Sequence, residues 1–433
     1  MANNELELLH ALAADDLLCN TSYPYKPEYF KQYQSHTDIM ADVEELSLYF
    51  HIPFCKNLCR FCEYTRFLLT NEAEEQHYLD LLERQVDDYL NHHTIKLLYG
   101  LDVGGGTPSV LSEKGLRRLF KITGGSSFAV PKVNDYESSI EFSYDTIDED
   151  KIALIGEAQF KRVSTGIQIY DFGIMNRYNR KTADLENIAA VNHAFKKAGI
   201  QKINLDVMYG FPNQTDETLA TTIAVIGQLD VEQVTLYEMR YNQNNLKIRN
   251  ITRKTLYNQY CQLYHSLTEM GYKARFGQNT FSKFDHDEGV SSYLRYRMKQ
   301  GLPYKGFGIS AQSMSMEGLS YNSLKGIATS YLPEIERIDE SYVYALPKEE
   351  IVGKYVCVSL YNGCFNLEVV SRILGADAES YYQEELSYLT DKQLIKIDNK
   401  IVNLTREGFE YYAVVAAFFW SKTHRMKYLR DRI

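Results

Sequence analysis

Short apolar segments alternate with longer amphipathic segments over residues 46–270. The apolar segments predict β-strands at 46–50, 96–103, 138–144, 161–168, 201–209 and 232–239. Between them, apolar residues recur every three or four positions, which predicts helices at 71–91, 112–122, 148–158, 184–198, 215–228 and 253–270. In the first of these helices, Asn71 and Glu74 are typical of a capped start, and Tyr78, Leu82 and Val86 follow with helical spacing.

Six strand–helix units in a row predict a parallel sheet with right-handed crossovers. A closed (β/α)8 barrel needs two more units, so we expect an α/β fold in the form of an open, partial (β/α)6 barrel with a wide lateral mouth. In folds of this kind, functional residues gather at the carboxyl ends of the strands. The loop that follows the first predicted strand is therefore expected at the functional edge of the sheet.

The segments outside this alternation suggest four regions. We expect an N-terminal arm at 1–45, the partial barrel at 46–275, an extension or connector at 276–345 and a small, mostly helical C-terminal domain at 346–433. Within the last region, 394–404 has the pattern of a hairpin, and Thr405 is the expected cap of a final helix.

Composition narrows the class of protein. The chain has 433 residues, of which 45% are hydrophobic and 24% charged, a balance typical of a globular protein. A net charge of −10 argues against sequence-independent nucleic-acid binding, which requires a basic surface. No apolar run approaches the roughly 20 residues of a membrane span, and no export signal is evident, so we expect a cytoplasmic protein. The 35 tyrosines against one tryptophan have no physical explanation here.

Three cysteines lie within eight residues, at Cys55, Cys59 and Cys62, in the spacing Cys-x3-Cys-x2-Cys. A disulfide is disfavoured because the chain has few cysteines for its length and no secretory signal. A zinc site would need a fourth ligand, and spacing alone does not exclude a distant histidine. A [4Fe–4S] cluster ordinarily has four cysteines, so three thiolates would leave one iron open for another ligand.

Five motifs follow one another in an order that resembles one family. They are Tyr49-Phe-His-Ile-Pro-Phe-Cys55, Gly104-Gly-Gly-Thr-Pro108, Arg162-Val-Ser-Thr-Gly-Ile-Gln168, Asn204-Leu-Asp-Val-Met-Tyr-Gly-Phe-Pro212 and Gly306-x-Gly-x-Ser-Ala-x-Ser313. This order resembles the oxygen-independent coproporphyrinogen III oxidase-like radical S-adenosylmethionine (SAM) enzymes. The resemblance implies the radical SAM barrel, a [4Fe–4S] cluster whose open iron is chelated by SAM, and reductive cleavage of SAM to a 5′-deoxyadenosyl radical.

The resemblance also implies roles for individual residues at the first SAM. Phe61 would cover the adenine, and Gly105, Gly106 and Thr107 would meet the SAM amino group. Glu141 would contact the SAM bound at the iron–sulfur cluster, and Tyr49 would be a cofactor-binding and catalytic residue. Without the resemblance, the glycines would be a plain strand–helix turn and Glu141 a solvated carboxylate on a strand.

A second SAM molecule is implied beside the first. Its ligands by resemblance are Gln168, Arg180 and Asp206, and Asp206 is in addition a candidate catalytic residue. Arg177 is close in sequence and could replace Arg180, and an arginine at a helix end is ordinarily a surface charge. Asp206 could also serve only to cap or brace the barrel.

Some positions depart from the family pattern and leave the activity open. Tyr64 stands where coproporphyrinogen oxidases tend to have a further cysteine, and the His-Asn-x-x-Tyr-Trp run of haem chaperones is missing from 280–300. We expect an oxidoreductase that abstracts hydrogen from a tetrapyrrole-like substrate, by decarboxylation or haem ring opening. The alternatives are a radical SAM C-methyltransferase or cyclopropanase and a non-catalytic haem-binding or haem-delivery protein. The family implies an electron donor such as flavodoxin or ferredoxin, and we expect a monomer.

Overall fold

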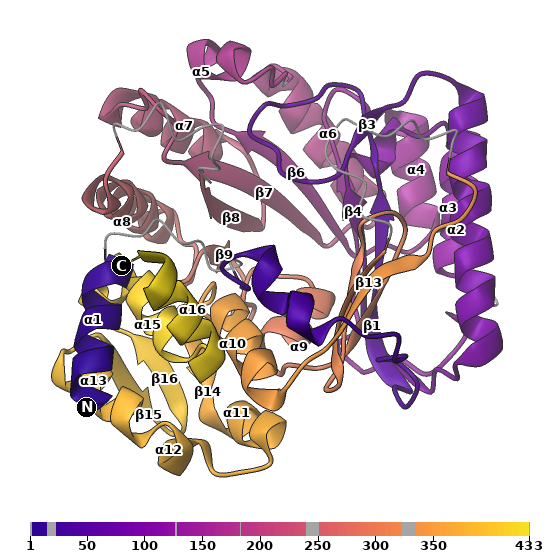
Figure 1. Ribbon diagram of the computed structural model, residues 1–433. Coiled ribbons are helices and arrows are strands. Elements are labelled where there is room, and N and C mark those ends of the chain that lie inside the picture. Colours follow the sequence, from indigo (N-terminus) through magenta and orange to yellow (C-terminus); the bar gives the residue numbers. More distant parts are fainter. Residues whose placement is uncertain are drawn as a thin grey trace.

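The computed structural model describes residues 2–14, 23–125, 128–181, 183–239, 251–322 and 335–432. Its main feature is an eleven-stranded sheet in the order β13-β12-β11-β10-β1-β4-β5-β6-β7-β8-β9 (Figure 1). Six neighbouring parallel strands form its centre: β1 (Glu45–Ile52), β4 (Leu97–Gly105), β5 (Ser138–Phe142), β6 (Arg162–Gln168), β7 (Lys202–Tyr209) and β8 (Gln233–Glu238). The predicted strands are confirmed, and the sheet stays open because β13 and β9 form its two edges.

Helices on the outside of the sheet connect these strands (Figure 1). They are α2 (Glu72–His92), α3 (Glu113–Thr123), α4 (Glu149–Glu157), α6 (Leu185–Lys197), α7 (Asp216–Gln228) and α8 (Arg253–Glu269). Each begins after an Asn, Ser, Asp or Thr whose side chain accepts a hydrogen bond from the first turn of the helix. The predicted cap Asn71, for example, accepts from the Glu74 N–H at 3.0 Å.

Alternation along the central strands separates an apolar face from a polar one. On β6 and β7, Val163, Ile167, Ile203, Leu205 and Val207 are fully buried, and these positions face the helices. The intervening positions pair across the strands as Arg162 with Lys202, Ser164 with Asn204 and Gly166 with Asp206. The concave face of the sheet is therefore polar, unlike the apolar core that usually fills a closed barrel.

Additional strands extend the sheet at both edges. β10 (Tyr304–Phe307) lies parallel to β1, and β11 (Gln312–Met314), β12 (Gly318–Asn322) and β13 (Glu340–Ala345) continue antiparallel from it. β9 (Thr280–Ser282) lies antiparallel to β8 at the other edge. The segment predicted as a connector thus contributes strands to both ends of the sheet, together with α9 (Ser292–Lys299). Shorter elements complete the barrel region: β2 (Phe54–Cys55), β3 (Phe67–Leu68), η2 (Pro108–Val110) and α5 (Phe172–Arg177).

The C-terminal region is mostly helical, as predicted. Its helices are α10 (Lys348–Ser359), α11 (Leu367–Leu374), α12 (Ala378–Tyr381), α13 (Gln383–Asp391), α14 (Arg406–Glu410), α15 (Tyr412–Phe418) and α16 (Lys422–Arg432). The expected hairpin is formed by β15 (Ile395–Asp398) and β16 (Ile401–Leu404), to which β14 (Cys364–Asn366) adds a third strand. Thr405 caps α14, but the single final helix predicted after it is wrong, because the backbone leaves helical geometry at Tyr411 and Phe419.

The N-terminal segment packs against this C-terminal region. Helix α1 (Ala2–Ala14) contacts α15 and α16 (Figure 1). Near the 3-10 helix η1 (Pro27–Tyr33), Tyr23 and Tyr33 both donate hydrogen bonds to the buried carboxylate of Glu350, which also accepts from the Ser421 hydroxyl. Thr21 and Ser22, which contribute to the family resemblance, lie outside the described residues.

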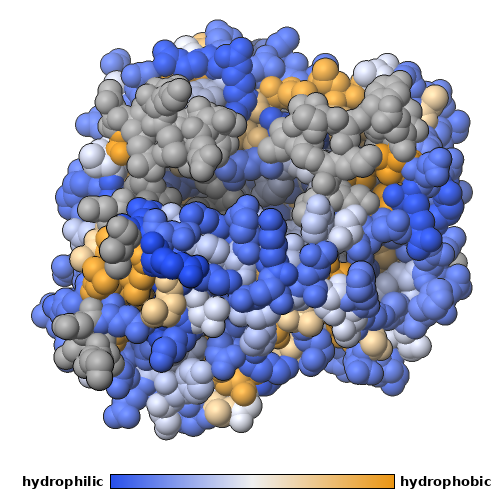
Figure 2. Space-filling model, in the orientation of Figure 1, coloured by the Kyte–Doolittle hydropathy of each residue, from blue (hydrophilic) through white to orange (hydrophobic). Residues whose placement is uncertain are grey.

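The face in Figure 2 is largely hydrophilic, with apolar residues in small separate patches. Within the described residues, no helix combines the length and the apolar character needed to cross a membrane.

Candidate active site at the carboxyl edge of the sheet

The three cysteines lie in the loop that follows β1, at the carboxyl edge of the sheet. All three are free thiols, with Cys55 and Cys59 buried and Cys62 partly buried. Buried Arg66 fixes the loop, because its guanidinium donates to the carbonyl of Cys59 at 2.6 Å and to that of Tyr64 at 3.0 Å. Burial raises the pKa of the Cys55 thiol to about 12 and raises that of Cys62 as well.

This donor set fits an iron–sulfur cluster. Among the residues that the structure describes, no three His, Cys, Asp or Glu side chains are placed to hold a single metal ion. In a [4Fe–4S] cluster each thiolate binds a different iron, so three cysteines of one loop suit such a cluster. Arg66 and Arg180 place positive charge beside thiols that would be ionised on binding iron, and Arg180 Nη1 lies 4.0 Å from Cys59 Sγ.

The glycine turn at the end of β4 is packed against protein on several sides. A Cβ atom on Gly105 would lie 2.7 Å from the His51 ring, and Gly105 has a φ of +117°, which favours glycine. On Gly106 a Cβ would lie 2.4 Å from the carbonyl oxygen of Phe54. The Thr107 hydroxyl donates to Cys55 Sγ at 3.8 Å. The turn therefore needs glycine for its own packing. The sequence had suggested only that glycine lets the backbone come close to a ligand.

Tyr49 and His51 form a hydrogen-bonded pair next to this turn. His51 Nε2 lies 2.9 Å from the Thr65 carbonyl oxygen, which fixes its proton on Nε2. Its Nδ1 then accepts from the Tyr49 hydroxyl at 3.3 Å. Burial lowers the pKa of His51 to about 4, so the ring is neutral near pH 7. Sequence reasoning missed this partner of Tyr49, although the i, i+2 spacing on one strand places both side chains on the same face.

Glu141 on β5 contacts the glycine turn directly. Its Oε2 accepts a hydrogen bond from the Gly105 N–H at 3.1 Å, and its carboxylate fills the space beside Gly104. Burial, reinforced by the nearby charge of Asp206, raises the pKa of Glu141 to about 7. The side chain nevertheless remains exposed to water, because it projects from the polar concave face of the sheet.

Asp206 and Gln168 lie on neighbouring strands, as the sequence predicted. Asp206 Oδ1 accepts from Asn204 Nδ2 at 2.7 Å, and burial raises the pKa of Asp206 to about 6. The β6–β7 register shifts between Gly166 and Gln168, and Gln168 adopts a left-handed φ of +62°. Its amide folds back over Gly166, where a Cβ atom would lie 1.9 Å from Gln168 Nε2.

The structure distinguishes Arg180 from Arg177. The Arg180 guanidinium points inward and donates to the Gly166 carbonyl. Its positive charge partly offsets the rise in the pKa of Asp206 that burial causes. Arg180 Nε is buried without a hydrogen-bond partner among the described residues. Arg177, by contrast, is exposed at the end of α5. Of the two arginines, only Arg180 reaches the strand end and the cysteine loop.

Phe61 rests on a separate apolar cluster at the same edge. Its ring lies 6.1 Å from that of Tyr178 and 6.0 Å from that of Phe211, measured between centroids. The cluster also includes Ile169, Ile174, Met175, Met208 and Met239. Because Phe61 immediately precedes Cys62, this cluster holds an aromatic surface next to the cysteine loop.

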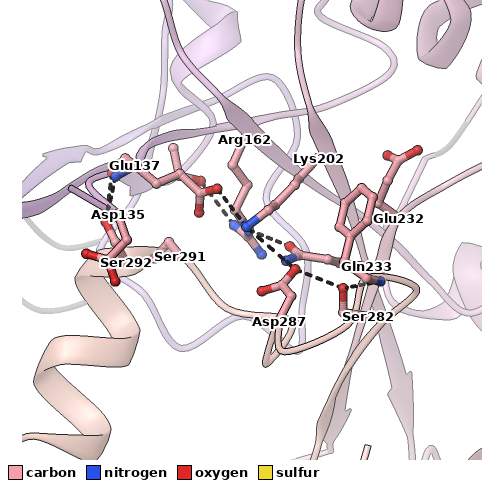
Figure 3. Close-up of polar contacts among 12 residues, drawn as sticks. Asp135, Glu137, Arg162, Lys202, Glu232, Gln233, Ser282, Asp287, Ser291 and Ser292 are labelled. Carbon is pink, nitrogen blue, oxygen red and sulfur yellow. Dashed lines mark hydrogen bonds and ion pairs between the residues drawn. The ribbon is translucent and has the colours of Figure 1, made fainter. Parts of the chain in front are cut away.

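A polar network that sequence reasoning missed occupies the opposite, amino end of the strands (Figure 3). Lys202 Nζ lies 3.0 Å from Glu137 Oε1 and 3.5 Å from Asp287 Oδ2. Arg162 Nε donates to Gln233 Oε1 at 2.8 Å, and Gln233 Nε2 donates to Asp287 Oδ2 at 2.7 Å. The first residues of β6, β7 and β8 thus fill the floor of the concave face, with the cysteine loop at its other end.

Asp102 on β4 lies above this floor and beside Tyr49, with which it pairs in register. Its Oδ2 accepts from the Ser291 hydroxyl at 2.7 Å, while Oδ1 is buried without a partner among the described residues. Burial raises the pKa of Asp102 to about 7. Nothing in the family motifs singles out this residue, and only the strand register reveals it.

Sequence comparison shows which known proteins this chain is similar to. Residues 49–226 match the sequence profile of the radical SAM superfamily. The chain is 26% identical over 412 residues to the oxygen-independent coproporphyrinogen III oxidase of Salmonella typhimurium, covering 90% of this chain and 89% of that protein. It is 25% identical over 376 residues to "Heme chaperone HemW" of Lactococcus lactis, covering 84% of this chain and 94% of that protein.

A solved structure extends the likeness to nearly the whole fold. Coproporphyrinogen III oxidase (HemN) from Escherichia coli superposes with a TM-score of 0.75 at 22% identity, covering 92% of this chain and 96% of that one. Residues 49–226 are therefore a radical SAM domain. The whole chain shares the fold of that coproporphyrinogen III oxidase, and the listed relatives agree with the resemblance drawn from its motifs. The oxidase and chaperone names among its relatives leave its individual activity to be determined.

Proposed function

We propose that this protein is a radical SAM oxidoreductase that abstracts hydrogen from a tetrapyrrole-like substrate, in a propionate decarboxylation or a haem ring opening. The observation that carries the proposal is that Glu141 bonds to the glycine turn beside the cysteine loop and lies near Asp206, on a concave face that remains open to water. A carboxylate at this position is suited to the ammonium group of SAM.

When bound, the [4Fe–4S] cluster and SAM supply the electron and the carbon radical for hydrogen abstraction. The residues of the chain hold and orient these groups. Cys55, Cys59 and Cys62 bind three irons. The Gly105–Thr107 turn presents backbone to the SAM amino group beside Glu141, and Phe61 offers an apolar surface for the adenine.

Tyr49 is proposed to act on the substrate side of this site. Because His51 is neutral and accepts at Nδ1, the Tyr49 hydroxyl keeps its proton and points along the concave face. The Tyr293 ring stacks on Tyr49 at a centroid distance of 5.8 Å and an angle of 25°. The buried Tyr293 thus holds the partly buried Tyr49 ring in place, and the names of the oxidase relatives suggest a tetrapyrrole substrate.

We propose a second SAM position between Gln168, Arg180 and Asp206. The buried Nε of the partly buried Arg180, which has no partner among the described residues, supports it, because a buried guanidinium donor ordinarily has an acceptor. Asp206 offers a carboxylate whose pKa of about 6 leaves it largely ionised at neutral pH. A second SAM here could be a co-substrate or a methyl donor, and the latter would make the protein a C-methyltransferase or cyclopropanase.

The test is an anaerobic assay of reconstituted protein with SAM, dithionite, and either coproporphyrinogen III or haem, read by mass spectrometry. Loss of propionate carboxyl groups or a linear tetrapyrrole, with stoichiometric 5′-deoxyadenosine, supports the proposal. A methylated acceptor with S-adenosylhomocysteine would establish the transferase instead. Haem that stays bound and unchanged would indicate the haem-binding function suggested by the relative named as a heme chaperone.

A further inference from the structure

Arg66 is a buried cation at the end of the cysteine loop. Only 7% of the residue is exposed, about as little as of Cys55 at 7% and Cys59 at 8%. Its guanidinium hydrogen bonds end on backbone carbonyls, those of Cys59 and Tyr64. Among the described residues, Arg66 forms no ion pair with a carboxylate. Because a buried charge without a counter-ion is costly, this position favours a negatively charged group beside it.

One donor of this guanidinium has no acceptor in the described part of the chain. Arg66 Nε is buried and unpartnered there, whereas Nη1 and Nη2 each donate to a carbonyl. Nη2 lies 2.6 Å from the carbonyl oxygen of Cys59. Burial raises the pKa of Cys55 and Cys62, and the charge of Arg66 partly offsets that rise. The positive charge of Arg66 therefore lies close to all three cysteines, and its Nε–H is available to an acceptor that the protein itself does not supply.

The backbone next to Arg66 is held in place. The Phe67 N–H donates to the carbonyl of Pro53 at 2.6 Å. The short parallel strands β2 and β3 then pair Cys55 with Leu68. These bonds fix the start of the Arg66 side chain relative to the first cysteine, as a pre-organised hydrogen-bond donor requires.

We propose that Arg66 raises the reduction potential of the [4Fe–4S] cluster, by donating its Nε–H to a cluster sulfur and by its buried positive charge. This inference rests on the proposed function, because it assumes a cluster at Cys55, Cys59 and Cys62. Reduction adds one electron, and a cation held nearby in a poorly solvated site stabilises the more negative, reduced form. Net charge, hydrogen bonds to the sulfurs and solvent exposure are among the factors that set the potential of such clusters.

The experiment is a redox titration followed by electron paramagnetic resonance. It uses the anaerobically reconstituted full-length protein, with dithionite as the reductant and without SAM or substrate. Arg66→Gln keeps an amide donor but removes the charge. We expect the equilibrium constant for one-electron reduction to fall about tenfold, which is a shift of about 59 mV to a more negative potential. Since salt screens a buried charge poorly, the shift should persist at high ionic strength.

Arg60→Gln is the matched control. Arg60 belongs to the same loop and also donates to a backbone carbonyl, that of Arg177 at 3.2 Å, but it is exposed to water. Its potential should therefore equal that of wild type. Equal shifts in Arg60→Gln and Arg66→Gln, or an unchanged potential in Arg66→Gln, would overturn the proposal.

Arg66→Lys separates tuning of the cluster from support of the loop. Lysine keeps the charge but cannot serve two carbonyls and a sulfur with one nitrogen, so its potential should lie between those of wild type and Arg66→Gln. If Arg66→Gln holds no iron, Arg66→Lys decides: a potential below that of wild type supports the proposal, and an unchanged one overturns it. Loss of iron from both variants would show that Arg66 only holds the loop, which also overturns the proposal. A wild-type protein that takes up no cluster would instead contradict the proposed function.

Discussion

The backbone N–H of Gly105 donates a hydrogen bond to Glu141 Oε2 at 3.1 Å, which joins the glycine turn of β4 to the carboxylate of β5. The same carboxylate lies close enough to Asp206 on β7 for the charge of Asp206 to help raise its pKa to about 7. The two proposed SAM positions are therefore electrostatically linked. A cationic ligand beside Glu141 would lower the pKa of both carboxyls.

Glu141→Gln tests the first SAM position. The glutamine oxygen can still accept from the Gly105 N–H, so the turn and the iron content should be preserved. Loss of the negative charge should weaken SAM binding about tenfold, which corresponds to roughly 1.4 kcal/mol. Equilibrium dialysis with labelled SAM measures this directly. Wild-type affinity in the variant would remove Glu141 from the SAM site.

Asp206→Ala tests the second position. We expect substrate turnover to fall about ten- to hundredfold, since loss of the carboxylate leaves bound donors unpaired at a cost of roughly 1–3 kcal/mol. Deoxyadenosine formation without substrate should be largely retained. If Asp206 merely braces the barrel, the melting temperature and both activities would fall together, and Asp206→Asn, which keeps an acceptor for Asn204, would restore all three.

Arg180→Gln and Arg177→Gln form a matched pair three residues apart. Arg180 reaches the Gly166 carbonyl and the Cys59 sulfur, whereas Arg177 is exposed. We therefore expect substrate turnover to fall about tenfold or more in Arg180→Gln, consistent with loss of a charged hydrogen-bond partner, and to stay near wild type in Arg177→Gln. Steady-state kinetics under dithionite compares the two. Equal effects, or a larger effect at Arg177, would contradict the assignment.

Asp102→Asn should alter the pH dependence of stability in the protein without cofactors. Burial raises the pKa of Asp102 to about 7 in the folded protein, above its ordinary value of about 4. The folded state then binds more protons between these values, so this group destabilises the fold as pH rises from 4 through 7. Asparagine does not titrate and can still accept from Ser291. The melting temperature of the variant relative to wild type should rise from pH 5 to pH 8, and a constant difference would exclude the shifted pKa.

The strands and helices of the barrel were predictable because their apolar and capping residues are local signals. Asn71 and Thr405, for example, cap the helices expected of them. The floor of the concave face was not predictable, because Lys202 meets Glu137 and Asp287 only through strand register and a loop more than 80 residues away. Asp102 was missed for a related reason, since its neighbours Tyr49 and Ser291 are distant in the sequence. His51 was missed although its partner Tyr49 lies two residues away on the same strand.

Among the candidate site residues, too, some were predictable from local sequence signals and others only from contacts made in the fold. The cysteine spacing and the glycine turn carry their chemistry in adjacent residues, so their position at the carboxyl edge followed from the fold class. The choice between Arg180 and Arg177 required the turn after α5, which directs one side chain inward and the other to solvent. The final helix was misread as continuous because Tyr411–Trp420 is uniformly apolar, and such a run does not mark where the backbone bends.

The central claim is that Cys55, Cys59 and Cys62 hold an iron–sulfur cluster that cleaves SAM. The most direct measurement is 5′-deoxyadenosine formation by anaerobically reconstituted protein with SAM and dithionite, alongside iron and sulfide content. Wild type should contain about four irons and four sulfides and absorb near ~400 nm, and it should form deoxyadenosine. The Cys55→Ala/Cys59→Ala/Cys62→Ala variant should lose all three properties. A triple variant that retains the absorbance, or a wild type that binds four irons yet forms no deoxyadenosine, would contradict the claim.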